Sequence, residues 1–400
     1  MKNVLTGLLS ILFFASCQNS GGQVDLLITN ASIVDMETGS VAQDRLVGIN
    51  QDTIAVIDRM GAEQTYTARK RIDAQGQYIL PGLWDNHSLA LGRKEEVSNA
   101  LDSLESLEVD YVKTYDGSLS PEVYYEIIRQ AEARGLKVTG HMPLSADIRK
   151  AMELGLDGVE HLYYFLPASS SVGDSLRSLN QGYGALVPLI NTYDEALAGK
   201  VMQEAAINGL FATPTLHIGK VLEELHIRDH SQDTLLNYIG PGVIGTYQGR
   251  EVSAKNRTPE AQEFYSKMET IFGEMLKPAF DSGINLLAGS DCGPFNSYVY
   301  PGASLHSELE AMVKVGMSPL EALRSSVVNG PAFFGLEKHY GNVAVGRAAD
   351  LILLRENPLA RIEHSRSIST VIRGTAIYDQ NKIEEFLRSL KKRYQATQEN

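Results

Sequence analysis

Three histidines and one aspartate occupy comparable places in the sequence, at or just after the end of a short apolar segment. They are His87, His141, His161 and Asp291. Each segment is typical of a buried strand, and the strands of a parallel β/α barrel end at one common mouth. Imidazole and carboxylate are ordinary ligands of Zn²⁺ and similar divalent ions. The spacing therefore predicts a divalent metal site at such a mouth, with zinc as the expected ion.

Lys113 ends another strand-like segment, which runs from Tyr111 to Tyr115. A charged ammonium would be repelled by a dication. The lysine must therefore be neutral, remote from the metal or chemically converted to an acid, and a plain salt-bridge lysine is the simplest alternative. Tyr115 lies at the same strand end and is a candidate hydrogen-bond donor to a substrate or its oxyanion.

Two further histidines are candidate substrate contacts. His217 follows the strand-like residues 211–216, and His306 lies just after the Asp291 loop. A surface position is the alternative for His306. Cys292, next to Asp291, is expected to be a small buried hydrophobic residue.

The chain between residues 81 and 339 alternates short apolar strands with amphipathic helices. This order is typical of βα units and parallel pairing. Helix boundaries are well marked: Ser120 precedes a proline at the first helical position, Gly135 ends that helix, and Ser318 with Glu321 forms a capping-box pattern. We expect a TIM-like (β/α) barrel over residues 81–339.

The two ends of the chain have β character instead. Residues 24–80 contain runs rich in β-branched side chains separated by Asn, Asp and Gly, which predict an antiparallel layer. Similar runs return within 340–380, and a charged helix and tail are expected over 381–400. Since chain termini often lie close together, both ends are expected to form one composite β-sandwich.

The first residues resemble a bacterial lipoprotein signal. An apolar stretch, residues 4–15, is too short to span a bilayer and ends in small residues before Cys17. The pattern predicts a signal peptide over 1–16, a lipidated Cys17 with a flexible spacer over 17–23, and an extracytoplasmic protein held to a bacterial membrane only by its lipid. An ordinary cleaved signal with an incidental cysteine is the alternative.

Charge and composition exclude several classes of protein. A content of 43% hydrophobic and 21% charged residues is typical of soluble globular domains. The formal net charge of −13, without a basic cluster, argues against a nucleic-acid partner. Two cysteines, Cys17 and Cys292, cannot build a thiolate metal cluster.

Several ordered motifs together resemble the metal-dependent amidohydrolase superfamily, in particular its prolidase-like and imidazolonepropionase-like members. The match covers about residues 24–378 and consists of Pro81-Gly82-Leu83-Trp84-Asp85-Asn86-His87, Val112-Lys113-Thr114-Tyr115, His141 with Glu160-His161 twenty positions later, Gly289-Ser290-Asp291, and residues 318–335 and 341–351. The resemblance implies a (β/α)8-type barrel with a mono- or binuclear metal centre, plus a composite β-sandwich.

The resemblance also implies roles for individual residues. Lys113 would be carboxylated, its carbamate bridging metals, with His141 and His161 completing one site. His87 and Asp291 would belong to the other site. Asp291 would also act as general base and proton shuttle.

The sequence departs from the family pattern in two ways. The family's first strand ends His-x-His, whereas Leu89 stands at the second position here. We therefore expect one ion and a weakened second site. Only 26 positions separate His87 from Lys113, which leaves room for one helix and one strand, so about two βα units are missing. Such an abbreviated barrel leaves strand edges that other segments or a second copy of the chain would cover.

The sequence thus predicts a hydrolase that uses metal-activated water on a C–N bond of an amide, a small peptide or a cyclic amide. The rival hypothesis is a catalytically degenerate protein of the same fold with a binding or scaffold role. A third, a carbohydrate-active protein, requires two carboxylates about 5 to 9.5 Å apart in a cleft, and nothing in the sequence selects such a pair.

Overall fold

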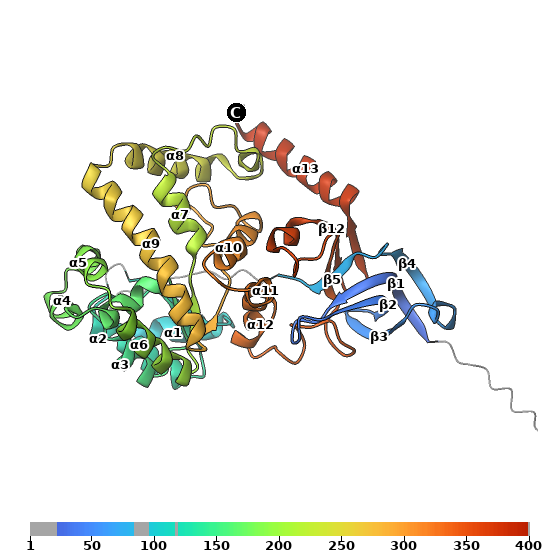
Figure 1. The fold of residues 1–400 in the computed structure, drawn as a ribbon, viewed down its shortest axis with the longest axis horizontal. Coiled ribbons are helices and arrows are strands. Elements are labelled where there is room, and N and C mark those ends of the chain that lie inside the picture. The colour runs from blue at the N-terminus through green and yellow to red at the C-terminus, as the bar shows by residue number, and fades with distance from the viewer. Residues whose placement is uncertain (1–21, 84–95, 117–118, 399–400) are drawn as a thin grey trace, which may run out of the picture.

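The computed structural model describes residues 22–83, 96–116 and 119–398. Cys17, His87 and Leu89 lie outside these residues, as does the predicted signal peptide. A mixed sheet stands on one side of the molecule and a larger strand-and-helix part on the other (Figure 1). Within the described ranges, no helix is both long and apolar enough to cross a membrane.

Strands from both ends of the chain share one eight-stranded sheet. They are β1 (Gln23–Val34), β2 (Val41–Asn50), β3 (Thr53–Arg59), β4 (Thr67–Asp73), β5 (Tyr78–Pro81), β11 (Asp350–Leu354), β12 (Ile368–Arg373) and β13 (Ala376–Asp379). The order is β13-β12-β11-β5-β1-β2-β3, and β4 also pairs with β1. We call this unit the composite sheet.

The composite sheet is mixed, so the prediction of an antiparallel layer over 24–80 is wrong for two of its strands. Both β4 and β5 run parallel to β1. Register shifts on either side of Ala31 mark irregularities in β1. The first part of β1 pairs with β4 and the part from Ser32 pairs with β5. The chain between β3 and β4 includes a short 3-10 helix, Glu63–Thr65, rather than a two-residue hairpin turn.

Alternating side chains of β1 feed two apolar clusters. Leu26 and Ile28 are fully buried in one cluster, and Leu27 is fully buried in the other. Successive side chains of a strand point to opposite faces, so both faces of the composite sheet are covered. Apolar burial on two faces stabilises this unit by roughly 25 cal/mol per Å² removed from water.

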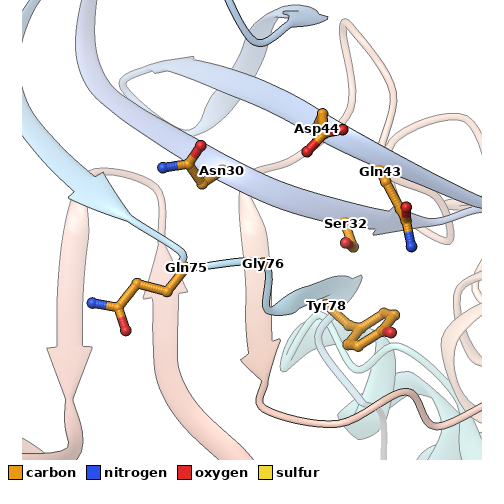
Figure 2. A pocket seen from close by; sticks show the side chains of 7 residues that line it. All are labelled: Asn30, Ser32, Gln43, Asp44, Gln75, Gly76 and Tyr78. Carbon is orange, nitrogen blue, oxygen red and sulfur yellow. The ribbon is translucent and has the colours of Figure 1, made fainter.

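A polar pocket of about 350 Å³ opens where the bulge of β1 meets the turn before β5 (Figure 2). Its lining includes Asn30, Asp44, Gln75 and Tyr78. Asn30 donates to Asp73 Oδ1 at 2.8 Å, and its carbonyl accepts from Gly76 N at 2.6 Å. The pocket thus follows from the hydrogen bonds of the bulge and the turn.

Parallel strands form the other part of the molecule. They are β6 (Val112–Thr114), β7 (Val138–Gly140), β8 (Gly158–Glu160), β9 (Phe211–Thr213) and β10 (Asn285–Leu286). β6 pairs with β7, and β8, β9 and β10 form a second sheet. Asp157 N donates to Val138 O at 3.0 Å across the gap between the two sheets. The described strands therefore pair in two separate sheets, and no strand pairing among them closes a barrel.

The first predicted barrel strand is not found in the described part of the chain. β5 ends at Pro81, which pairs with Leu351 in the composite sheet. The apolar residues that suggested a strand leading to His87 are therefore used by the β unit, because β11 offers an open edge for pairing.

Helices follow most of the parallel strands. They are α1 (Val97–Ser106), α2 (Pro121–Glu132), α3 (Ile148–Glu153), α6 (Glu195–Ile207), α7 (Leu216–Glu224), α8 (Pro241–Lys255), α9 (Pro259–Asp281), α10 (Ala303–Lys314), α11 (Pro319–Val327) and α12 (Asn329–Phe333). The predicted caps form: Ser120 accepts from Val123 N, and Ser318 and Glu321 make the capping box. Local hydrogen bonding therefore set these boundaries.

Two segments lie outside this regular alternation. Between β8 and α6, the chain forms η3 (Leu162–Ser169), α4 (Gly173–Leu179), η4 (Gly182–Ala185) and α5 (Leu186–Asn191). At the C-terminus, α13 (Gln380–Gln398) packs on β13, α8 and η5 (Thr234–Tyr238).

Candidate metal centre

The ends of β6, β7 and β8 bring three of the predicted residues together. Lys113 lies inside β6, while His141 and His161 directly follow β7 and β8. His141 N donates to Thr114 O at 2.9 Å, and His161 N donates to Thr213 O at 2.8 Å. Backbone hydrogen bonding to the neighbouring strand thus continues to each histidine and fixes where its side chain starts.

A glycine allows the close approach of β6 and β7 at this point. Gly140 has φ +114°, and a Cβ there would lie 2.4 Å from Thr114 O and 2.8 Å from Lys113 Cγ. No other residue fits this space and this backbone conformation. Gly140 therefore lets the backbone beside Lys113 pack directly against the strand that carries His141.

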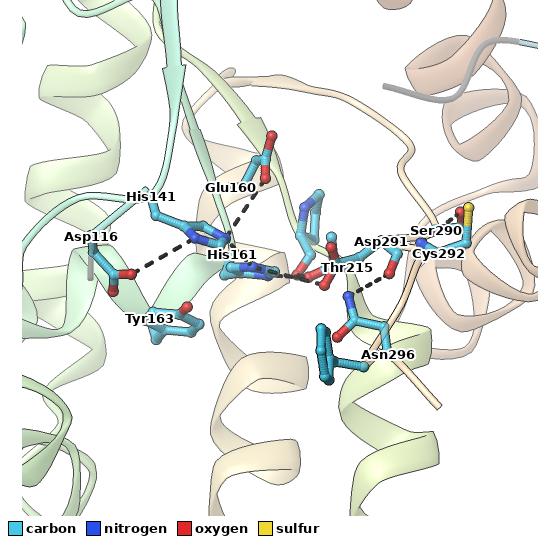
Figure 3. Close-up of polar contacts among 12 residues, drawn as sticks. Asp116, His141, Glu160, His161, Tyr163, Thr215, Ser290, Asp291, Cys292 and Asn296 are labelled. Carbon is cyan, nitrogen blue, oxygen red and sulfur yellow. Dashed lines mark hydrogen bonds and ion pairs between the residues drawn. The ribbon is translucent and has the colours of Figure 1, made fainter. Parts of the chain in front are cut away.

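The two histidines face each other through their Nε2 atoms, which are 2.9 Å apart (Figure 3). His141 is 6% exposed. Two imidazoles that hold Zn²⁺ at about 2.0–2.1 Å in tetrahedral geometry have nitrogens about 3.3 Å apart. The observed separation is close to that spacing.

Glu160 completes the cluster from the last position of β8. Its Oε2 lies 3.8 Å from His141 Nε2, and the residue is 6% exposed. One ligand atom from each of His141, Glu160 and His161 lies within 4.8 Å of the others. Two nitrogens and a carboxylate oxygen are a suitable donor set for zinc, so the residues present fit a divalent ion.

His161 is held in the tautomer that a ligand needs. Its Nδ1 lies 2.6 Å from Thr215 Oγ1, and this hydroxyl donates to Pro214 O at 2.8 Å. The hydroxyl must therefore accept from Nδ1–H, which leaves the Nε2 lone pair for a metal. Burial lowers the pKa of His161, so the imidazole stays neutral, as metal binding requires.

Asp116 stands behind the other histidine. Its Oδ1 lies 3.8 Å from His141 Nδ1, and its Oδ2 accepts from the Tyr164 hydroxyl at 3.1 Å. Carboxylates in this position orient ligand histidines in many metal sites. Asp116 therefore lies where its carboxylate can orient the His141 imidazole toward a bound ion.

Lys113 pairs with the acid of the cluster. Its Nζ lies 2.5 Å from Glu160 Oε2, and the two side chains are 1% and 8% exposed. The sequence allowed Lys113 to be neutral, remote from the metal, converted to an acid or part of a salt bridge. The structure shows the salt bridge, as a buried ion pair inside the cluster. Carboxylation of Lys113 stays a prediction.

Asp291 lies beside the cluster, in the segment that follows β10, a strand of the same sheet as β8. Its Oδ2 is 4.0 Å from His161 Nε2, and its backbone carbonyl accepts from Asn296 Nδ2 at 2.6 Å (Figure 3). The ring of Tyr115 lies 4.5 Å from the ring of His141. Burial raises the pKa of Tyr115, with smaller contributions from Asp116 and Asp291, so its hydroxyl keeps its proton.

The two candidate substrate histidines lie elsewhere. His217 lines a separate pocket of about 230 Å³ with His230, Tyr300 and Arg366. Burial lowers the pKa of His217 to about 4. His306 is 8% exposed and lies 2.9 Å from Ser365 Oγ through Nδ1, so the surface alternative for it is wrong. Neither histidine belongs to the cluster around His141 and His161.

Sequence reasoning missed three residues of the site: Glu160, Asp116 and Thr215. Glu160 was visible only as the neighbour of His161. Asp116 follows Tyr115 by one position, and Thr215 lies two positions after the end of β9. A search for every polar residue within two positions of a strand end would have found all three.

Comparisons with known proteins agree with this geometry. The family model described as "Amidohydrolase family" matches residues 272–377. Imidazolonepropionase from Bacillus velezensis is 30% identical over 393 residues, which cover 83% of this chain and 90% of that protein. The chain therefore belongs to the amidohydrolase superfamily.

Other relatives are longer or more distant. Adenine deaminase 2 from Desulfotalea psychrophila is 24% identical over 85% of this chain, which spans only 56% of the length of that relative. Among solved structures, the bottromycin amidohydrolase has a TM-score of 0.70 at 19% identity and covers 91% of this chain and 89% of its own. The structure of a putative prolidase from Bifidobacterium longum has a TM-score of 0.60 at 17% identity and covers 92% of this chain and 99% of its own. These likenesses show an α/β amidohydrolase fold.

Proposed function

We propose that this protein is a metal-dependent hydrolase that cleaves a C–N bond in an amide, a small peptide or a cyclic amide. The observation that carries the proposal is the buried His141–His161 pair, whose Nε2 atoms face each other at 2.9 Å next to Glu160. The relatives named as deaminase, imidazolonepropionase and prolidase support the reaction class.

His141, His161 and Glu160 would hold the ion in this proposal. A bound divalent cation lowers the pKa of the water that it binds and polarises the scissile carbonyl. Carboxylation of Lys113 would remove its positive charge and would require its ion pair with Glu160 to open. His87 remains the candidate for a second, weaker site.

Asp291 and Tyr115 would handle the proton and the developing charge. The Asp291 carboxylate lies close enough to the cluster to accept a proton from the attacking water and to pass it to the leaving nitrogen. The neutral Tyr115 hydroxyl can donate to the oxyanion that forms from the carbonyl. The Asp291 carboxylate and the Tyr115 hydroxyl both lie on segments that follow strand ends, so one bound substrate can contact both.

Metal content tests the proposal against the scaffold alternative. The full protein, purified without chelator, should contain one divalent ion per chain by mass spectrometry. His141→Ala and His161→Ala should lose it, whereas the matched control His339→Ala, at an exposed histidine, should keep it. A metal-free wild type that folds normally would support the scaffold role, and so would a loaded protein that hydrolyses no member of an amide and dipeptide panel.

We also propose that Cys17 anchors the protein to the outer side of a bacterial membrane by lipid. The support is the apolar stretch and the small residues before this cysteine. Cys17→Ser should move the protein from the membrane fraction to the soluble fraction. An unchanged distribution would contradict the lipid anchor.

A further inference from the structure

Exposed aromatic rings gather in the segments around the metal centre. In the described part of the chain, the exposed aromatic residues are Tyr115 (49%), Tyr183 (51%), Phe295 (65%) and Phe386 (56%). Three of them belong to segments that follow β6, β8 and β10, which also carry the site residues. Large exposed apolar groups in one neighbourhood mark a binding surface.

Tyr115 forms the part of this surface nearest to the ligands. Its ring lies 4.5 Å from the ring of His141 although half of the residue is exposed. The charges of Asp291 and Arg250 both act on the pKa of its hydroxyl. Tyr115 is therefore in contact with a candidate ligand, and one of the charges that act on it, Arg250, also donates to the Phe295 carbonyl.

Tyr183 forms the solvent end of an aromatic stack. The ring of Tyr163 lies parallel to His161, with ring centroids 5.1 Å apart and planes within 10°. The hydroxyl of Tyr163 lies 3.4 Å from that of Tyr183, which sits in the additional segment between β8 and α6. The stack thus leads from a metal ligand to the surface.

Phe295 is held on the surface in a strained conformation. Its φ of +72° is rare for a bulky residue. Its N–H donates to Thr246 Oγ1 at 3.1 Å, and its carbonyl accepts from Arg250 Nη1 at 2.7 Å. Its neighbour Asn296 donates to the Asp291 carbonyl. Residues in a strained backbone conformation persist only where the surrounding structure holds them, and they are often found at ligand-binding sites.

We propose that Tyr115, Tyr183 and Phe295 form an aromatic rim that binds an aromatic ring carried by the substrate next to its scissile C–N bond. The hydrolysis of such a substrate rests on the proposed function, whereas binding of the ring does not. Offset or edge-to-face contacts between rings favour an aromatic group over a saturated ring of equal size. The substrate class is therefore an arylalkyl amide.

Two matched pairs of compounds test the rim with the full, metal-loaded protein. Phenylacetate and cyclohexylacetate are compared by calorimetric Kd, and phenylacetamide and cyclohexylacetamide by kcat/KM. The saturated ring removes aromatic geometry while keeping apolar bulk. The wild type should favour the phenyl member of each pair by about 3- to 10-fold.

Variants separate the rim from other roles. Tyr183→Leu and Phe295→Leu should each reduce the preference toward 1. Tyr115→Phe should keep it while losing the hydroxyl, and Tyr115→Leu should reduce it. Phe386→Leu changes an exposed phenylalanine on α13 and should leave the preference unchanged, with the melting temperatures of all variants compared first.

The outcomes distinguish the rim from the hydrolase proposal. A phenyl preference in binding, without hydrolysis of either amide or of any member of the amide and dipeptide panel, supports the rim and removes the proposed function. Equal hydrolysis of both amides together with equal Kd values supports the function and overturns the rim. A preference that survives all three leucine substitutions also overturns the rim.

Discussion

The composite sheet and the metal centre differ in which residues adopt the left-handed backbone conformation, in which φ is positive. In the sheet, the non-glycine residues with positive φ are Asn30, Asp44, Gln51 and Gln75, which are polar and lie at turns and bulges. Around the metal centre, the non-glycine residues with positive φ are His161, Thr215, Asp291 and Phe295. Asn and Asp tolerate this conformation, whereas bulky and β-branched residues are strained in it. The sheet is thus arranged for stability and the centre for the placement of side chains.

Buried polar groups show the same difference. The sheet clusters consist of side chains such as Leu26 and Leu353, which gain free energy by leaving water. The centre buries Lys113, Glu160 and His141, whose desolvation costs free energy. The two regions should therefore respond differently to substitution and to metal.

Loss of a metal ligand should give the largest effect. His161→Ala removes one of two nitrogens from the cluster, so kcat/KM should fall by about 10³-fold or more because several kcal/mol of charge stabilisation are lost. Steady-state kinetics measures this, and metal content measured in parallel should fall as well. Retention of both would separate the cluster from catalysis.

Breaking the buried ion pair should destabilise the metal-free protein. Glu160→Gln leaves the Lys113 ammonium buried without its carboxylate, so the free energy of unfolding should fall by about 3–5 kcal/mol. The double variant Lys113→Met, Glu160→Gln should regain most of this loss. Equal denaturation midpoints for the single and double variants would mean that the pair carries little energy.

A cavity in the composite sheet should lower stability without touching the metal. Leu26→Ala removes a fully buried side chain and should cost about 2–5 kcal/mol in denaturant unfolding. The ion content of the folded protein should not change. The control Val345→Ala, at a 61% exposed residue, should stay within about 0.5 kcal/mol of wild type.

Removal of the Thr215 hydroxyl, which accepts a hydrogen bond from His161 Nδ1, should have the smallest effect. Thr215→Val keeps the shape and removes the acceptor for Nδ1–H, so metal affinity should fall about 10- to 100-fold in competition with a chelator. Thr215→Ser restores the hydroxyl and should restore affinity. If valine and serine behave alike, shape rather than the hydrogen bond orients the imidazole.

Local features of the fold were predictable because they depend on neighbouring residues. Ser120, Ser318 and Glu321 cap helices as their sequence pattern indicates. The short apolar segments before His141 and His161 form strands, which pair in parallel with β6 and β9. The hydrogen bond from Asp157 N to Val138 O brings these two strands side by side. That much of the site follows from strand ends alone.

The remaining features depend on backbone conformations that a pattern does not reveal. In a regular strand, Glu160 and His161 would point to opposite faces. The φ of +67° at His161 breaks that alternation, which lets both side chains join one cluster. The register shifts beside Ala31 likewise let β4 and β5 share β1, so periodicity alone suggested the wrong strand direction.

The position of β5 has a consequence for synthesis of the chain. β5 pairs on one side with β11, and the paired residues Pro81 and Leu351 are roughly 270 positions apart. An emerging polypeptide must therefore keep an apolar edge uncovered until most of its length has been made, and such edges favour aggregation. A holding chaperone that shields this edge should raise the yield of folded protein more than one that acts after release.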